Sequence, residues 1–271
     1  MMDIISLLSH GFIQRGLLAG SFIAILCATL GTFLVLRRFS LIGDGLAHVT
    51  FGGVAVGLFL RMYPMYVAVP IVMISSIGIL KLVEKARLYG DSAIGIVSSL
   101  GIACGILLAS AAGGFNVDLF SYLFGNILAI STTEVVLSII LSTVLIVVIW
   151  FFYHDLLSIT FDEESARASG VRTKTIDAIL VLLTSLTVVL AMRLVGIMLI
   201  SSLLILPPVT ALQLARGFRM TIFIASAAGV IAVLVGVFLS LVADLPTGGT
   251  IVVLNFVIFV AAFFFGKILA R

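Results

Sequence analysis

Long apolar stretches separated by short polar segments run along the whole chain. Runs of 18 or more mostly apolar residues are long enough to cross a hydrocarbon core about 30 Å thick, and stretches of this length favour helices. The pattern predicts transmembrane spans at 12–36, 41–60, 65–83, 92–112, 132–152, 176–193, 194–213, 220–242 and 249–268.

A shorter apolar segment, LFSYLFGNILAI at 119–130, has too few residues to span a membrane. It predicts a re-entrant or interfacial helix, which has to be buried in protein where it enters the membrane. We therefore expect an all-α fold, a polytopic integral membrane bundle of eight or nine transmembrane helices plus this short helix. The whole chain, 1–271, is expected to form a single transmembrane domain.

Composition supports this fold class and excludes a soluble globular protein. Of the 271 residues, 62% are hydrophobic and 10% are charged, and the mean hydropathy is +1.38, whereas soluble domains are about half apolar. The first residues carry Asp3 and lack a basic start, so we expect the first span to act as an uncleaved signal-anchor. Cys27 and Cys104 lie in separate apolar runs and are interpreted as packing residues.

The basic residues predict an orientation. If segment 154–177 is cytoplasmic, alternation of the spans places twelve of the fifteen Lys and Arg residues inside, and only Arg15, Arg61 and Arg193 outside. Cytoplasmic loops of membrane proteins carry such an excess of Lys and Arg. The N-terminus is thus expected outside and the C-terminus in the cytoplasm.

Segment 154–177, HDLLSITFDEESARASGVRTKTID, is the only connection long enough to meet a partner. We expect a cytoplasmic loop that contains a short helix, with Asp162 and the acids after it in the first turn and Ser169-Gly170 as its end. An ordinary solvated loop is the alternative.

Sequence motifs of enzymes are missing. The chain has no GxxxxGK[ST] phosphate-binding loop, no CxxC, no HExxH, no GxSxG and no dinucleotide fingerprint. We expect neither an enzyme nor a nucleic-acid-binding protein. If transport is active, its energy has to come from another chain or from an ion gradient.

Asp44 and His48 are the candidate metal ligands. They lie four residues apart at the start of the second span, and residues i and i+4 share one face of a helix. A carboxylate and an imidazole together suit Zn²⁺, Mn²⁺ or Fe²⁺, and ionisable groups inside a span usually mark a functional pathway. The alternative is that Asp44 caps the helix while His48 makes a local hydrogen bond. Two residues cannot complete a four-ligand shell, but a symmetric dimer would supply two of each.

Further residues have structural rather than chemical interpretations. Gly52, Gly53 and Gly57 leave one side of the second span bare, which favours close helix packing. Pro207 and Pro208 lie inside a span and predict a kink or break that could line a cavity and act in gating. Asp244, in the outer turn VADLPTGGTI, is a possible outer gate, or simply a turn residue.

Five motifs in order resemble the permeases of bacterial ATP-binding cassette (ABC) importers for zinc, manganese and iron. They are RRFSLIGDGLAHVTFGGVAVG, SYLFGNIL, ITFDEESARASGV, VGIMLISSLLILPPVTA and DLPTGG, and they cover nearly the whole chain. The segment FDEESARASGV also resembles, more loosely, the coupling segment of siderophore and vitamin B12 permeases.

The resemblance implies a homodimeric permease of the bacterial plasma membrane, surrounded by lipid and worked by two cytoplasmic ATPase subunits that alone bind ATP. A metal-binding protein outside the membrane would deliver Zn²⁺ or Mn²⁺, or Fe²⁺, as the transported ion, and no cofactor would be bound permanently. By the family's motifs, Asp44 and His48 would bind the ion. Glu163, Ala166 and Gly170 would dock the ATPase.

Three other functions remain open from the sequence. They are a proton-coupled secondary carrier that uses Asp44 and His48 as a relay, an ABC permease for a metal chelate, and a membrane scaffold without transport. The sequence also leaves open which metal is carried.

Overall fold

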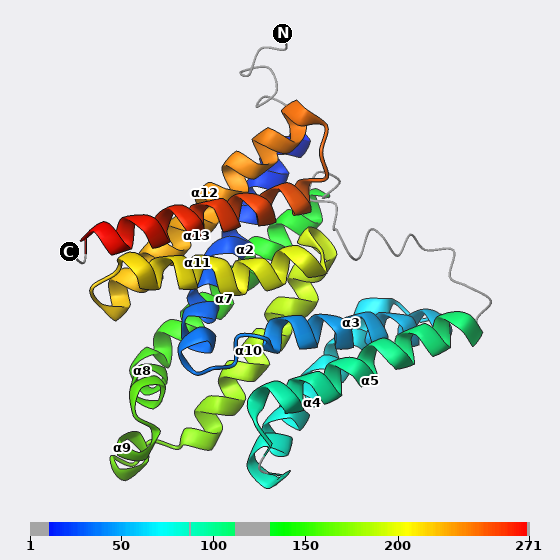
Figure 1. The fold of residues 1–271 in the computed structure, drawn as a ribbon. Coiled ribbons are helices and arrows are strands. Elements are labelled where there is room, and N and C mark those ends of the chain that lie inside the picture. Colours follow the sequence, from blue (N-terminus) through cyan, green and yellow to red (C-terminus); the bar gives the residue numbers. More distant parts are fainter. Residues whose placement is uncertain (1–10, 87, 112–130, 270–271) are drawn as a thin grey trace.

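The computed structural model describes residues 11–86, 88–111 and 131–269. Helices account for the regular structure of these ranges (Figure 1). In chain order they are α2 (Gly11–Leu36), α3 (Ile42–Phe59), α4 (Pro64–Ala86), α5 (Gly90–Ala111), α7 (Thr132–Phe151), α8 (Tyr153–Phe161), α9 (Glu163–Ala168), α10 (Thr173–Val195), α11 (Ile197–Leu214), α12 (Phe218–Ala243) and α13 (Thr247–Leu269).

Within the described ranges, nine helices are long and apolar enough to cross a membrane. They coincide with the nine predicted spans, and each boundary agrees within a few residues. The prediction of an all-α membrane bundle is therefore confirmed. The short helix predicted at 119–130 lies outside the described residues.

The helices form two packed groups (Figure 1). One group is α3 with α4 and α5, and the other is α2 with α7, α11, α12 and α13. Helix α10 contacts both groups, since it packs on α3 and α4 as well as on α2 and α11. Helices α2, α3 and α10 are mostly buried, while α4, α5, α7 and α13 expose apolar side chains such as Leu100, Leu107 and Val147. An apolar surface of this extent suits lipid or another membrane chain.

Segment 154–177 is largely helical, so the prediction of a loop is wrong in that respect. Helix α8 follows α7 after Phe152 and buries Leu156 and Ile159, and α10 begins already at Thr173. The short helix inside the segment is confirmed as α9. Asp162 is its N-cap and accepts a hydrogen bond from the Ser165 backbone N–H at 3.0 Å. Helix α8 was not predicted because it buries only two side chains, Leu156 and Ile159, within a segment that carries many polar residues.

Helix α11 runs continuously through Pro207 and Pro208, so a break does not occur there, while the kink and the gating role stay predictions. Each proline removes one backbone donor, which leaves the carbonyls of Leu203 and Leu204 without their usual helical partner. The Leu204 carbonyl oxygen faces Gly31 of α2, which has no side chain to keep the two helices apart. Neighbouring helices often preserve proline-containing membrane helices in this way.

The glycines of α3 are sites of backbone-to-backbone packing, as predicted. A Cβ atom added to Gly52 would lie 2.5 Å from the carbonyl oxygen of Gly101 on α5. One added to Gly53 would lie 2.8 Å from the Cα of Ala68, and one added to Gly57 would lie 2.7 Å from the Cα of Pro64. Of these three glycines, Gly52 thus contacts α5, and Gly53 and Gly57 contact α4.

We predict that Gly52→Ala destabilises the protein by about 1–3 kcal/mol, because the added methyl group meets backbone that cannot rotate away. Gly78→Ala is the matched control, since a Cβ atom at this helical position on α4 meets nothing within 4 Å. Its effect should stay within about 0.5 kcal/mol. Thermal unfolding of the purified chain in detergent measures the change in stability of each variant. Equal unfolding midpoints for the two variants would contradict the packing at Gly52.

Candidate functional site

Asp44 and His48 lie on the same face of α3, as their spacing predicts. Asp44 is in the first turn, and its Oδ2 atom is 3.5 Å from Nε2 of His48. The side chains are 47% and 29% exposed, respectively, so the pair is neither sealed in the core nor fully solvated. Both groups are therefore accessible to an ion.

Asp44 does not cap α3, so the capping part of the alternative interpretation is wrong. The N-cap residue is Leu41, and no side chain bonds the free N–H groups there. Instead, the Ser201 hydroxyl of α11 donates to Oδ1 of Asp44 at 3.2 Å. The carboxylate joins two helices that are 157 residues apart in sequence.

The glycines on either side of Asp44 explain how other helices come so close. The position of a Gly43 side chain is filled by the Leu204 side chain of α11. A Cβ atom on Gly45 would lie 2.5 Å from Cγ2 of Ile94 on α5. The Gly-Asp-Gly sequence therefore lets α11 and α5 pack at the level of the carboxylate.

One chain supplies an incomplete metal site. Among the described residues, no group of three or more His, Cys, Asp or Glu side chains is placed to hold an ion. If Asp44 and His48 bind an ion, as the sequence predicts, the other members of its shell have to come from elsewhere. This agrees with the sequence argument that one chain alone is insufficient.

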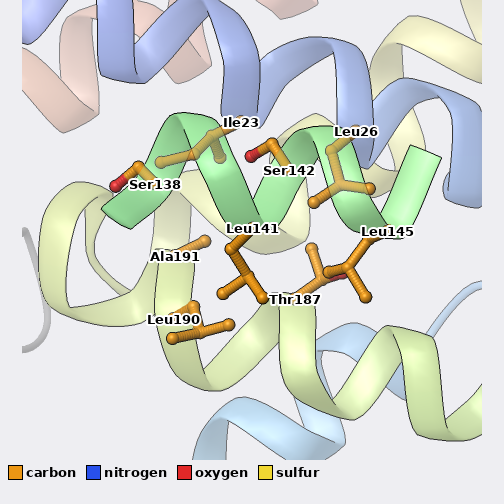
Figure 2. Close-up of a pocket in the computed structure, with 9 residues that line it drawn as sticks. All are labelled: Ile23, Leu26, Ser138, Leu141, Ser142, Leu145, Thr187, Leu190 and Ala191. Atoms are coloured by element: carbon orange, nitrogen blue, oxygen red, sulfur yellow. The ribbon is translucent and has the colours of Figure 1, made fainter. Parts of the chain in front are cut away.

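Figure 2 shows a gap among α2, α7 and α10, about 20 Å³ in volume. Its lining is mostly apolar, and the Ser138 and Thr187 hydroxyls donate to carbonyls of their own helices. The gap has room for about one water molecule. It offers no chemistry that competes with the Asp44–His48 pair.

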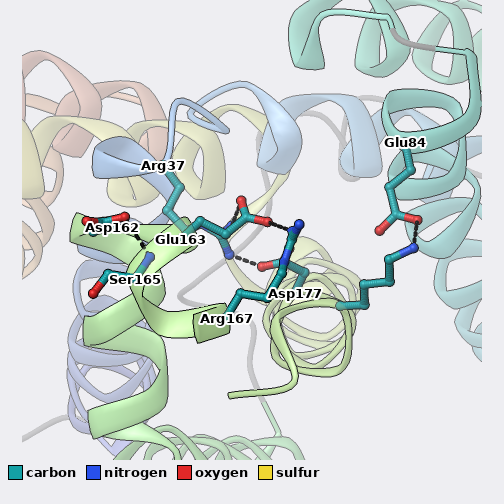
Figure 3. Close-up of polar contacts among 8 residues, drawn as sticks. Arg37, Glu84, Asp162, Glu163, Ser165, Arg167 and Asp177 are labelled. Atoms are coloured by element: carbon teal, nitrogen blue, oxygen red, sulfur yellow. Dashed lines mark hydrogen bonds and ion pairs between the residues drawn. The ribbon is translucent and has the colours of Figure 1, made fainter. Parts of the chain in front are cut away.

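The residues predicted to dock an ATPase are together on α9 and just after its end, and Figure 3 shows Glu163 among them. Glu163 is the first residue of the helix and accepts a hydrogen bond from Arg167 at 2.7 Å. Ala166 is buried, at 3% exposure. Gly170 has a φ of +90°, a backbone conformation that favours glycine, and the space around it is open.

Arg37 also lies in this region, and the sequence predicted no role for it beyond its place among the cytoplasmic basic residues. It forms ion pairs with Glu163 and with Asp177 of α10, while its own side chain is only 9% exposed. The pairing could not be anticipated from spacing because 140 residues separate Arg37 from Asp177. Ser201 was missed for the same reason, although it lies in one of the quoted motifs.

Asp244 is the C-cap of α12, with a φ of +52°, and it is exposed in the turn to α13. Asp tolerates this left-handed conformation better than most residues. The turn is closed by the Ser240 hydroxyl, which donates to the Leu245 carbonyl at 2.6 Å. This geometry accounts for Asp244 as a turn residue, and its role as an outer gate stays a prediction.

Comparison with known proteins agrees with this arrangement. The model of the ABC 3 transport family matches residues 9–266. The chain is 34% identical to the manganese transport system membrane protein MntC of Halalkalibacterium halodurans, over 96% of this chain and 89% of that protein. It is 32% identical to the high-affinity zinc uptake system membrane protein ZnuB of Haemophilus influenzae, over 92% and 95% of the two chains.

The fold is also that of a solved structure. PsaBC from Streptococcus pneumoniae, determined in complex with a Fab, superposes with a TM-score of 0.85 and is 32% identical, covering 96% of this chain and 94% of the other. The nine candidate spans of the described residues, the Asp44–His48 pair on α3 and the helix α9 thus occur in a chain that matches one family over nearly its full length. The chain is a membrane permease of the ABC 3 transport family.

Proposed function

We propose that this permease carries a divalent transition-metal ion, Zn²⁺ or Mn²⁺ and in the same class Fe²⁺, inward across the bacterial plasma membrane. The observation that supports this most directly is the Asp44–His48 pair, half exposed on a buried helix and held from α11 by Ser201. Carboxylate and imidazole are ligands that these ions share. The names of two relatives, a manganese and a zinc transport protein, point to the same class of ion.

The working unit that we propose is a homodimer with two ATPase subunits in the cytoplasm and a metal-binding protein outside. Two copies of Asp44 and His48 would make four ligands, the number that one chain lacks. ATP would be bound and hydrolysed only on the partner subunits, because this chain has no phosphate-binding loop. A C-terminus in the cytoplasm follows from the distribution of Lys and Arg. Membership of the ABC 3 transport family argues against the proton-coupled secondary carrier.

Transport would proceed by alternating access. The outward-open dimer receives the ion from the binding protein, and the two Asp44–His48 pairs replace its water. The ATPases then move α9 and the helices joined to it, which changes the separation of the two pairs and weakens their hold on the ion. Only neutral His48 can act as a ligand, so an acidic exterior would oppose loading. Pro207 and Pro208 lie on α11 one to two turns from Ser201, and we assign them to the gating movement of this helix.

The first prediction concerns the two ligands. Asp44→Asn and His48→Ala should each lower uptake of Zn²⁺ or Mn²⁺ at least about tenfold, since each change removes one ligand from each protomer. Uptake of the radioactive ion is measured in vesicles that contain the complete transporter. Asp91→Asn is the matched control because Asp91 is also an exposed acid in the first turn of a candidate span. Uptake by Asp44→Asn equal to that of the control would exclude the proposed site and favour a scaffold or a chelate permease.

A second prediction concerns Ser201. Ser201→Ala removes this hydroxyl and should reduce the affinity of the site for the metal ion about 10-fold. Groups that orient a metal ligand typically contribute 10- to 100-fold to the affinity. Ser202→Ala is the control at the neighbouring position. The Ser202 hydroxyl is buried and makes no hydrogen bond in the described structure, so its removal should leave affinity and stability the same or slightly higher. Isothermal titration of the purified complex with the metal ion measures the affinity of both variants. Equal affinities would mean that Ser201 does not orient Asp44 in the site.

A third prediction concerns ATPase docking. Gly170→Ala should weaken the ATPase–permease association about 5- to 30-fold, because a left-handed non-glycine residue costs about 1–2 kcal/mol and the end of α9 has to shift. Gly217→Ala is the matched control, since its surroundings are equally open but its φ of −172° suits any residue. Titration of the permease in nanodiscs with labelled ATPase measures the affinity. No difference between the variants would mean that the end of α9 does not contact the ATPase.

A further inference from the structure

A buried arginine joins three elements at the end of the bundle that carries α9. Arg37 is the first residue after α2, and its side chain is 9% exposed. Its Nη1 pairs with Oδ1 of Asp177, in the second turn of α10, and its Nη2 is 3.8 Å from Oε2 of Glu163, the first residue of α9 (Figure 3). One guanidinium thus connects the end of α2, the start of α10 and the start of α9.

Burial distinguishes this cluster from an ordinary surface ion pair. Lys174 and Glu84 form a pair nearby at 3.4 Å, but their side chains are 78% and 40% exposed, and such pairs contribute little. A guanidinium that is largely removed from water depends on its carboxylates, because an unpaired buried charge is strongly unfavourable. Asp177, at 17% exposure, shares this burial, whereas Glu163 is 43% exposed, so Arg37 fixes the end of α2 to α10 and joins α9 at the more exposed edge of the cluster.

The side-chain chemistry requires arginine. A guanidinium presents several N–H donors in a planar fork and can serve two carboxylates in different directions, as it does here. An ammonium group is a single point charge on a flexible stem and cannot reproduce that fork. The neighbouring Arg38 does not share this role, since its side chain is exposed and it makes no ion pair in the described structure.

The segment after Arg37 leads directly to the metal-site helix. The Phe39 N–H donates to the Leu34 carbonyl at 2.8 Å, and the Ile42 N–H donates to the Phe39 carbonyl at 3.0 Å. Arg38, with a φ of +61°, makes the turn between these bonds. Helix α3 then begins at Ile42, and Asp44 follows in its first turn. A short connection closed by hydrogen bonds thus separates the arginine from the ligand.

We propose that Arg37 is a positioning residue that links the coupling helix α9 to the start of the metal-site helix α3, so that movement of α9 reaches Asp44 through residues 37–41. The proposal rests on the proposed function, because α9 is the ATPase-docking helix only if the chain works as described above. Arg37 does not touch the ion or ATP. It acts by keeping Glu163, Asp177 and the end of α2 in one rigid unit.

The experiment measures the ratio of ions transported to ATP hydrolysed, in vesicles that contain the permease, the ATPase and the binding protein. For Arg37→Gln we expect hydrolysis to continue while ions transported per ATP fall at least tenfold. Lys174→Gln is the control, because it also removes a positive charge nearby, from the exposed Lys174–Glu84 pair, but lies outside residues 37–41, and it should keep the wild-type ratio. A wild-type ratio in Arg37→Gln would overturn the proposal.

A second variant covers the case in which Arg37→Gln does not assemble. Arg37→Lys keeps the positive charge but not the fork, and we expect it to assemble and to lose at least threefold in ions per ATP. If uptake and hydrolysis fall in proportion, the residue serves only to stabilise the protein and the proposal is wrong. A failure of the proposed function is recognised separately, because the unmodified complex would then not transport the ion at all.

Discussion

The packing of Leu204 is the contact on which the geometry of the site depends. Its carbonyl oxygen, freed by the missing N–H of Pro208, faces Gly31 of α2, and its side chain occupies the space beside Gly43 of α3. Leu204 itself is 1% exposed. Ser201 is three residues earlier, on the same face of α11. The contact that fixes α11 against α2 and α3 therefore also brings the Ser201 hydroxyl to Asp44.

Because α11 is not broken at Pro207 and Pro208, the prolines contribute to the packing of this helix instead of interrupting it. Helix α11 is continuous through both prolines, and its Leu204 contacts both α2 and α3. Gly31 and Gly43 let the α2 and α3 backbones come close enough to pack around Leu204. Bulkier residues at either glycine would separate the three helices before Ser201 could reach the carboxylate.

Much of the fold could be predicted from the sequence, because each transmembrane span is set by the length of a local apolar run. The pairing of Asp44 with His48 was also local, since four residues on one helix fix it. The contacts of Ser201 and Arg37 were not predictable, because each joins elements more than a hundred residues apart. Helix α8 was not predicted because it buries only Leu156 and Ile159, and the break expected at the prolines does not occur in a helix that packs closely on α2 at Leu204.

In the proposed metal site, the spacing of Asp44 and His48 bears on how an ion would be selected. Neighbouring ligands at 2.0–2.2 Å from an ion lie about 3.3–3.6 Å apart in a tetrahedral shell, and about 2.8–3.1 Å apart in an octahedral one. The 3.5 Å between Asp44 Oδ2 and His48 Nε2 matches the tetrahedral shell that Zn²⁺ prefers. A six-coordinate ion would draw the two atoms together by about half an ångström. Since the Ser201 hydroxyl bonds the other carboxylate oxygen, discrimination in the proposed site would depend on how far Asp44 can follow the ion.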